Sequence, residues 1–397
     1  MAFDTPLLAV HRELGARLVE FAGWRLPLQF TSVAEEARAC RQSAALFDIS
    51  HMGLVRMVGG SARAAASRLV TRDLTAIPVG CAAYALLLDE RAGILDDLFV
   101  MVDSDASVVM VVNAVNHEKD AAWIGRHLGA TSQACHSERS EACPERSRRE
   151  SRRVHQVRLE DSRGTTFGLA LQGPEAEAIL RRAAPGEEPP ELFATIKRIR
   201  IAEAEVIVSR TGYTGEDGFE VFGEARNAID VWGAVSGAGG GHESARPTPA
   251  GLAARDVLRQ EMGYPLWGSD ISRETTPRQA GLGWAVDSAA DFIGREALDN
   301  APVTRRRFGF VIEDHGVARS GDGILVSGDR VGAVSSGTYS HNLGTAIGQG
   351  YVSLTANPRP GMEMETEAHG KRLRARLASL PLIPKKTRKS WRQLKEA

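Results

Sequence analysis

Two adjacent aspartates, Asp96 and Asp97, stand in an apolar stretch and are the first candidates for acid–base chemistry. Residues 93–102 (GILDDLFVMV) have the composition of a buried strand, along which successive side chains point to opposite faces. The two carboxylates therefore lie on different faces. Because both faces are apolar, we expect at least one carboxylate to be partly buried, which is costly without partners. Residue types alone leave two interpretations open: an aspartate that caps a neighbouring loop, or a functional carboxylate.

A second set of polar residues surrounds three closely spaced glycines. Residues 211–217 (TGYTGED) join two predicted strands, 203–210 and 218–222, and the glycines permit a close approach of ligand to backbone. Glu220 lies inside the second strand between large apolar residues, so its carboxylate faces either a pocket or solvent. A polar hairpin turn explains the same composition equally well.

A predicted helix that begins at Thr248–Pro249 and ends at Gly263 carries Arg255 close to its apolar side. An arginine in this position either extends its charged end from an apolar surface, pairs with a nearby acid, or binds a ligand. His51 stands alone in a semi-apolar segment, where a structural role is the more common one.

Bulk properties exclude several classes of protein. The 397 residues include 49 Lys and Arg against 50 Asp and Glu, a balance that argues against bulk electrostatic binding to nucleic acid. The four cysteines form no CxxC pair, so no zinc site or disulfide framework is expected, and a reducing compartment fits. The sequence contains no GxSxG or HExxH motif, and no metal site is predicted. Without an apolar run of about twenty residues or a basic leader, we expect a cytoplasmic protein with no membrane span.

The elements that must position these residues follow from apolar spacing. We expect helices over 7–20, 118–127 and 174–182, a hairpin of strands 93–102 and 108–113, and a strand at 166–172. After about residue 300, short strand-like runs alternate with glycine turns and indicate a small barrel or sandwich. These runs are residues 307–312, 323–326, 330–334, 346–352 and 362–366.

Residues 131–154 interrupt this pattern with a Ser-, Glu- and Arg-rich text (CHSERSEACPERSRRESRR) that has almost no large apolar residue. Such a segment cannot bury a face and is predicted to be a disordered surface insertion. The alternative is a basic RNA-binding arm, which the interspersed glutamates weaken. The end of the chain, 385–397, is a basic tail.

Ten stretches resemble, in order, the aminomethyltransferase or T-protein family of the glycine cleavage system. They are TPLLAVHRELGARLVEFAGWRLPLQF, LFDISHMG, GILDDLFVMV, VVNAVNHEKD, LALQGP, SRTGYTGEDGFEVF, PAGLAARDVLRQEMGYPLWG, QAGLGWAV, DFIGREAL and SSGTYSHNLGTAIGQGYV. Each motif is moderately specific, whereas the ordered set covers nearly the whole chain. The resemblance implies an α+β fold with three lobes and folate in a central channel. Two mixed α+β lobes would span 1–290 and a C-terminal β-barrel would span 300–384.

The resemblance also implies a reaction. An aminomethyl group on the lipoyl sulfur of the H-protein gives its methylene carbon to tetrahydrofolate, ammonia leaves, and 5,10-methylenetetrahydrofolate forms. Tetrahydrofolate is then the co-substrate, and the lipoylated H-protein is the partner. In the family, the second aspartate of the GILDD motif, here Asp97, lies beside the reacting nitrogens of the folate. A carboxylate there orients the folate and stabilises developing positive charge.

Other site residues carry over by motif. Met52 (SHMG) and Tyr84 (AAYALLL) are implied to line the folate cleft, and Asn113 (VVNAVN) to hydrogen-bond the pterin. Tyr213 (TGYTG) and Glu220 (DGFE) belong to the same site. A carboxylate suits the pterin because a ring N–H there stands beside an exocyclic amine.

Two arginines complete the implied site. Arg255 (LAARD) is a binding residue of the family, and Arg388 corresponds to a late arginine in some members. The ending PLIPKKTRKS differs from the usual family ending, which weakens the second assignment.

Two other functions occur on the same fold. Folate-linked demethylases usually carry a fused flavin domain, for which this chain has no room. Non-enzymatic folate-binding repair proteins carry a cysteine-containing KGC motif, where this chain has SRTGYTGEDGFE. The resemblance therefore favours the aminomethyltransferase.

Overall fold

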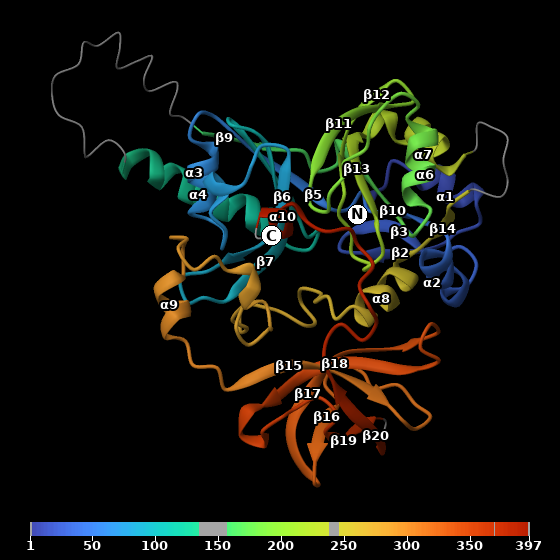
Figure 1. Ribbon diagram of the computed structural model, residues 1–397, viewed down its shortest axis with the longest axis vertical. Coiled ribbons are helices and arrows are strands. Elements are labelled where there is room, and N and C mark those ends of the chain that lie inside the picture. Colours follow the sequence, from blue (N-terminus) through green and yellow to red (C-terminus); the bar gives the residue numbers. More distant parts are fainter. Residues whose placement is uncertain (1, 135–156, 238–245, 369, 396–397) are drawn as a thin grey trace.

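The computed structural model describes residues 2–134, 157–237, 246–368 and 370–395 (Figure 1). Two larger sheets lie side by side at one end of the molecule, and a closed barrel of six strands lies at the other. The predicted α+β class, with mixed lobes followed by a C-terminal barrel, is confirmed. None of the helices in the described part of the chain is long and apolar enough to cross a membrane.

The first large sheet holds the aspartate pair. Its strand order is β6-β7-β8-β5-β9. The bounds are Cys81–Leu88, Ile94–Ser104, Ser107–Val112, Gly53–Val58 and Arg158–Asp161. Helices α3 (Ala62–Ser67) and α4 (His117–Ala134) belong to this lobe. The predicted hairpin is confirmed as β7–β8, and β8 is buried along its whole length, as expected for a continuous apolar run.

The second large sheet has the order β11-β12-β13-β10-β4-β14. Its strands are Ile196–Ile201, Ala204–Ser209, Gly218–Glu224, Thr166–Gln172, Ala45–Asp48 and Thr248–Ala250. Helices α6 (Ala176–Ala183) and α7 (Ala228–Ser236) pack against one another on this lobe. One apolar core, which includes Val100 of β7 and Phe222 of β13, is shared by the two large sheets.

The N-terminal segment departs from the prediction. The helix expected over 7–20 is only α1, Leu8–Glu13, and Arg17–Phe21 form strand β2. Gly15 lies between them at φ +73, a left-handed conformation that ends the helix. Strand β2 then pairs with β3 (Trp24–Gln29), which also pairs with β1 (Phe3–Asp4). The spacing of leucine and valine is compatible with a helix, but residues 17–21 form a strand because they pair with β3.

The helix that carries Arg255 also begins later than predicted. Thr248–Ala250 form strand β14 beside β4, and the N-cap of α8 (Leu252–Glu261) is Gly251. A Cβ at Gly251 would lie 2.3 Å from the carbonyl oxygen of Leu28, so only glycine fits there. The Gly251 N–H donates to Glu36 Oε2 (2.9 Å), a carboxylate of α2 (Val33–Gln42) that replaces a side-chain cap.

The barrel has the strand order β15-β18-β17-β16-β19-β20 and closes on itself. Its strands are Arg305–Ile312, Thr345–Ser353, Asp329–Ser340, Gly323–Val326, Glu363–Ala368 and Lys371–Ala378. Five were predicted, although β17 extends well beyond residue 334. The sixth, β20, was missed because its outward residues are Lys and Arg, which hide the alternation with buried Leu and Ala. The remaining elements are α9 (Arg295–Asn300), α10 (Trp391–Lys395) and short 3-10 turns at Leu74–Ala76, Ala225–Asn227, Gly283–Ala285 and Leu354–Ala356.

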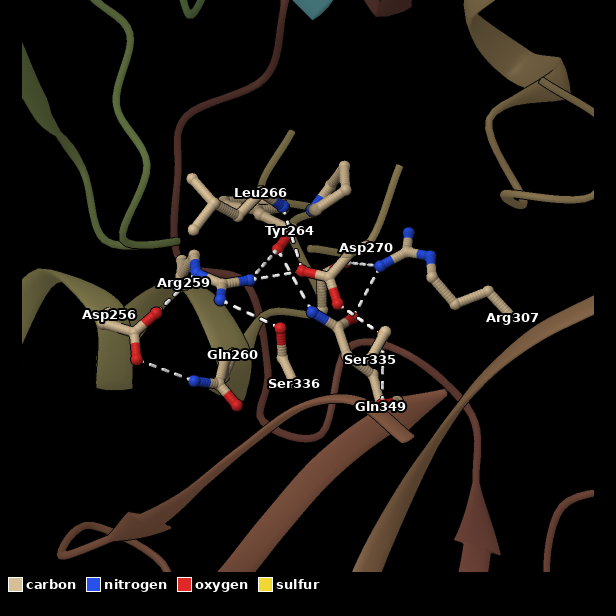
Figure 2. Close-up of polar contacts among 12 residues, drawn as sticks. Asp256, Arg259, Gln260, Tyr264, Leu266, Asp270, Arg307, Ser335, Ser336 and Gln349 are labelled. Carbon is tan, nitrogen blue, oxygen red and sulfur yellow. Dashed lines mark hydrogen bonds and ion pairs between the residues drawn. The ribbon is translucent and has the colours of Figure 1, made fainter. Parts of the chain in front are cut away.

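A buried polar network joins the barrel to α8 (Figure 2). Arg259 of α8 donates to Asp270 Oδ2 (2.7 Å) and to Ser336 Oγ of β17 (3.2 Å). The second oxygen of Asp270 accepts from Ser335 Oγ (2.5 Å), also on β17. Arg307 of β15 donates to the carbonyl oxygen of Gly263 (2.9 Å). Helix α8, which carries Arg255, is therefore bonded to the barrel through Arg259 and to α2 through its N-cap Gly251.

The end of the chain runs back from the barrel and passes between the two large sheets (Figure 1). Trp391 is buried in their shared core, and its indole N–H donates to the carbonyl oxygen of Ala82 in β6 (3.0 Å). The predicted insertion, 131–154, lies outside the described residues except for 131–134, which form the end of α4.

Candidate active site

Asp97 lies on β7 with its carboxylate held by two side chains. The Tyr84 hydroxyl donates to Asp97 Oδ2 (2.9 Å), and the Asn113 amide donates to Oδ1 (3.0 Å). Tyr84 and Asp97 share a face because β6 and β7 are paired with Leu86 opposite Asp97. Burial raises the pKa of Asp97 to about 7, with a further contribution from the negative charge of Asp96. The group is thus poised to gain or lose a proton near neutral pH.

Asp96 is fully buried and shares one hydrogen-bond partner, Asn113, with Asp97. Its carboxylate accepts from the backbone N–H of Asn113 (2.9 Å), the side-chain amide of Asn113 (2.9 Å) and the amide of Asn116 (2.7 Å). The amide of Asn113 therefore bridges the two aspartates. Asp96 is the satisfied carboxylate of the pair, whereas Asp97 keeps partial exposure to the site.

An aromatic surface borders Asp97. The Tyr84 ring stacks on Trp284, with centroids 5.2 Å apart, and meets Phe99 edge-on at 5.8 Å. Trp284 is 62% exposed, so a large flat ring is presented next to the carboxylate. Exposed aromatic surface of this kind suits the face of a planar ligand.

A second group of site residues comes from the other large sheet and from α8. Arg255 lies over the ring of Tyr213, with 5.0 Å from Cζ to the centroid, and the charge of Glu220 acts on the same guanidinium. Glu220 is nearly buried and accepts from the Thr211 hydroxyl (2.6 Å). The Tyr213 hydroxyl donates to the carbonyl oxygen of Pro265.

Tyr213 connects the two groups. Burial raises the pKa of its hydroxyl, and the nearby charge of Asp97 raises it further. Tyr213 thus lies within electrostatic reach of both Asp97 and Arg255, although β7 and α8 are far apart in sequence. The structure brings together five of the predicted site residues, namely Tyr84, Asp97, Asn113, Tyr213 and Arg255, and places Glu220 beside Arg255.

Arg255 carries an unused donor. Its Nη1 is buried and has no hydrogen-bond partner among the residues that the structure describes. An unpaired buried guanidinium N–H is costly, so this atom marks a position where a ligand acceptor would be stabilised. Burial lowers the pKa of Arg255, and the charges of Glu220 and Tyr213 oppose that effect.

Met52 and His51 lie in the turn after β4. Met52 is partly buried and packs against the core shared by the two large sheets. His51 is buried, and burial, together with the positive charge of Arg255, lowers its pKa to about 4. The imidazole is therefore neutral at pH 7, and His51 is a neighbour of Arg255 that sequence reasoning had left as structural.

Arg388 has other partners. Its guanidinium donates to Glu177 Oε2 (2.7 Å) and lies 3.9 Å from Asp217 Oδ2. Both carboxylates are also bound by the buried Arg210. The structure therefore engages Arg388 in an ion-pair network on the second lobe, and not with Asp97.

Two residues of this region were missed by sequence reasoning, Asn116 and Asp120. Both are 1% exposed and lie behind β7, and α4 carries Asp120. They are four apart in the motif VNHEKD, so a helix places them one turn apart on one face. That four-residue spacing was the feature of the sequence from which a shared polar face could have been predicted. In the described part of the chain, no group of three or more His, Cys, Asp or Glu side chains is arranged to hold a metal ion.

Comparisons with known proteins agree over the whole length. The family model of the GCVT N-terminal domain matches residues 7–290, and that of the glycine cleavage T-protein C-terminal barrel domain matches residues 305–383. An aminomethyltransferase of Anoxybacillus flavithermus is 37% identical over 385 residues, covering 95% of this chain and 97% of the relative. One of Thermotoga maritima is 38% identical over 351 residues, covering 88% and 89%.

A solved structure extends the likeness to three dimensions. The glycine cleavage system aminomethyltransferase T of Bartonella henselae superposes with a TM-score of 0.83 at 32% identity, covering 98% of this chain and 100% of that one. Fold, sequence and domain order therefore agree, and the chain belongs to the aminomethyltransferase (T-protein) family of the glycine cleavage system.

Proposed function

We propose that this aminomethyltransferase moves the methylene carbon of an aminomethyl group from the lipoyl sulfur of the H-protein to tetrahydrofolate, with release of ammonia. The observation that carries the proposal is the carboxylate of Asp97. It is fixed by Tyr84 and Asn113, and its pKa of about 7 makes it responsive to charge that develops beside it. In its ionised form Asp97 orients the reacting amine and stabilises positive charge on it.

The donors and acceptors of the site fit a pterin. The carboxylate of Glu220 suits the adjacent ring N–H and exocyclic amine, and the unpaired Nη1 of Arg255 suits a carbonyl oxygen. Trp284 and Tyr84 offer stacked rings beside Asp97 for flat parts of the ligand. These features support tetrahydrofolate as the co-substrate, with Met52 and Tyr213 lining the same site.

Replacement of Glu220 by Gln tests the pterin contact. The amide keeps the shape of the side chain and can still accept from Thr211, but it presents a donor where the pterin also donates. We expect tetrahydrofolate to bind about 10- to 100-fold more weakly, the loss typical of a charge-assisted hydrogen bond. Tryptophan fluorescence titration gives the dissociation constant.

Glu224→Gln is the matched control, because Glu224 ends the same strand and its side chain is 61% exposed. Its affinity for tetrahydrofolate should equal that of the unmodified protein. Equal affinity in Glu220→Gln as well would remove Glu220 from the site.

The activity itself is tested with aminomethylated H-protein. We expect ammonia and methylenetetrahydrofolate in equal amounts when tetrahydrofolate is present, and only slow ammonia release without it. Failure to form either product with an H-protein preparation that serves a known T-protein would overturn the proposal. Demethylation of sarcosine or dimethylglycine instead would support the demethylase alternative, which the named relatives do not favour.

A further inference from the structure

A second layer of carboxyl groups lies behind Asp97, between β7 and α4. Asp96 and Asp120 are both buried, and a hydrogen bond joins their side chains. The side-chain amide of Asn113 donates to Oδ1 of Asp96 (2.9 Å) and to Oδ1 of Asp97 (3.0 Å). Asp120, Asp96 and Asp97 are therefore successive members of one network that reaches the proposed site.

Two carboxyl groups can hydrogen-bond only when one of them keeps its proton. Burial raises the pKa of Asp96, but its carboxylate already accepts three N–H donors from Asn113 and Asn116, which stabilise its charged form. Asp120 Oδ2 has no partner among the described residues. The proton therefore belongs on Asp120 and the negative charge on Asp96. Burial, with the charge of Asp96, raises the pKa of Asp120 to about 11, in agreement with this assignment.

We propose that Asp96 and Asp120 form a positioning pair, in which neutral Asp120 keeps Asp96 ionised so that Asp96, through Asn113, orients Asp97 and delays its ionisation. The inference rests on the proposed role of Asp97. An apolar group at position 96 would leave the Asn113 amide without its bridge, and any neutral group there would let Asp97 ionise more readily because the adjacent negative charge is gone. The pair thus adds to the effect of burial, which is the larger cause of the raised pKa of Asp97.

The sign of the effect follows from the groups that face Asp97 and Asp120. Negative charge on Asp96 raises the pKa of Asp97, while hydrogen bonds from Tyr84 and Asn113 lower it. Other titratable groups near the two carboxyls are Tyr213 from the loop before β13 and Lys119 from α4. Arg126 of α4 and Arg273 line the cavity that borders Asp120. If ionised Asp97 is the active form, turnover rises with pH through about 7. Removing the charge of Asp96 lowers the pKa of Asp97, so the acid limb moves to lower pH.

The test is the pH dependence of kcat/KM, measured as ammonia release from aminomethylated H-protein with tetrahydrofolate. We expect the acid limb of Asp96→Asn to move down by about one pH unit or more, as removal of an adjacent charge predicts. Asp120→Leu should move it in the same direction, because Asp96 then loses the hydrogen bond that lowers its pKa and carries less negative charge beside Asp97. A cavity of about 250 Å³ borders Asp120 and gives the leucine room.

Glu118→Gln is the control, since it removes an 83% exposed carboxylate from the same helix. Its acid limb should match that of the unmodified protein. Asp120→Asn retains a neutral donor and should move the limb less than Asp120→Leu. A folded Asp96→Asn or Asp120→Leu protein with an unmoved acid limb overturns the proposal.

Infrared titration of the unmodified protein shows which carboxyl group keeps its proton, even if Asp96→Asn and Asp120→Leu do not fold. The difference from Asp97→Asn isolates the carboxyl band of Asp97, and the difference from Asp120→Asn isolates that of Asp120. We expect Asp120 to keep its protonated band well above the pH at which Asp97 loses its own. A band of Asp120 that disappears before that of Asp97 would refute the assignment. Near-normal turnover in Asp97→Asn would instead contradict the proposed function, and the infrared result would still report on the pair.

Discussion

Asp97→Asn is expected to lower the turnover of aminomethylated H-protein by about 10²- to 10⁴-fold, the range found for a group that assists proton transfer or stabilises charge. The amide has nearly the shape of the carboxyl, so Tyr84 and Trp284 should stay in place. It cannot carry the negative charge that a developing cation needs. Single-turnover measurements of methylenetetrahydrofolate formation separate this effect from binding.

The fold should tolerate Asp97→Asn. A carboxyl whose pKa is raised to about 7 in the folded protein favours unfolding as pH rises from its usual value of 3.8 through 7, because ionisation is easier in the unfolded chain. The neutral amide removes this cost. We therefore expect a melting temperature at pH 8 at least as high as that of the unmodified protein. Asp105→Asn, at an 89% exposed position in the turn after β7, should leave both turnover and melting unchanged. Near-normal turnover in Asp97→Asn would end the catalytic assignment.

Arg259→Ala should have the largest effect on stability. The side chain is 4% exposed, and its loss leaves the fully buried carboxylate of Asp270 without its cation (Figure 2). Breaking a buried pair in this way costs about 3–5 kcal/mol. Equilibrium unfolding in urea gives the difference in free energy, and the loss of barrel contact should also expose α8 to hydrogen exchange.

Arg278→Ala provides the comparison, because Arg278 and Asp299 are 42% and 45% exposed in their ion pair. An exposed pair contributes only about 0–1 kcal/mol. If Arg259→Ala were no more destabilised than Arg278→Ala, the network of Figure 2 would not be what fixes the barrel to α8.

The elements that can be predicted well are those whose residue pattern favours one type of secondary structure. The largely apolar, valine-rich runs of β7 and β8, separated by a polar turn, favour buried strands, and they were found with nearly correct bounds. Residues 14–20 show the opposite case, because their leucine and valine spacing also fits a helix, and only pairing with β3 makes 17–21 a strand. In β20 the outward arginines mask the period of two.

The site was predictable only in part, for a physical reason. Alternation along β7 separates Asp96 from Asp97 but cannot tell which of them faces the ligand. That depends on Tyr84, which β6 places on the same face as Asp97, and on Tyr213, which lies in the loop before β13, more than a hundred residues away in sequence. Family motifs supplied what local pattern could not. They did not supply Asp120, whose role appears only when α4 packs behind β7.

The burial of Trp391 beneath β6 has a consequence for synthesis. Its partner, the carbonyl of Ala82, precedes it by 309 residues. At about 5–20 residues per second, a ribosome needs roughly 15–60 seconds to make the intervening chain. Throughout that time the core shared by the two large sheets lacks the indole of Trp391. A message that ended before the codon for Trp391 would therefore yield a protein with every proposed site residue present but without the indole that packs in the core shared by the two large sheets.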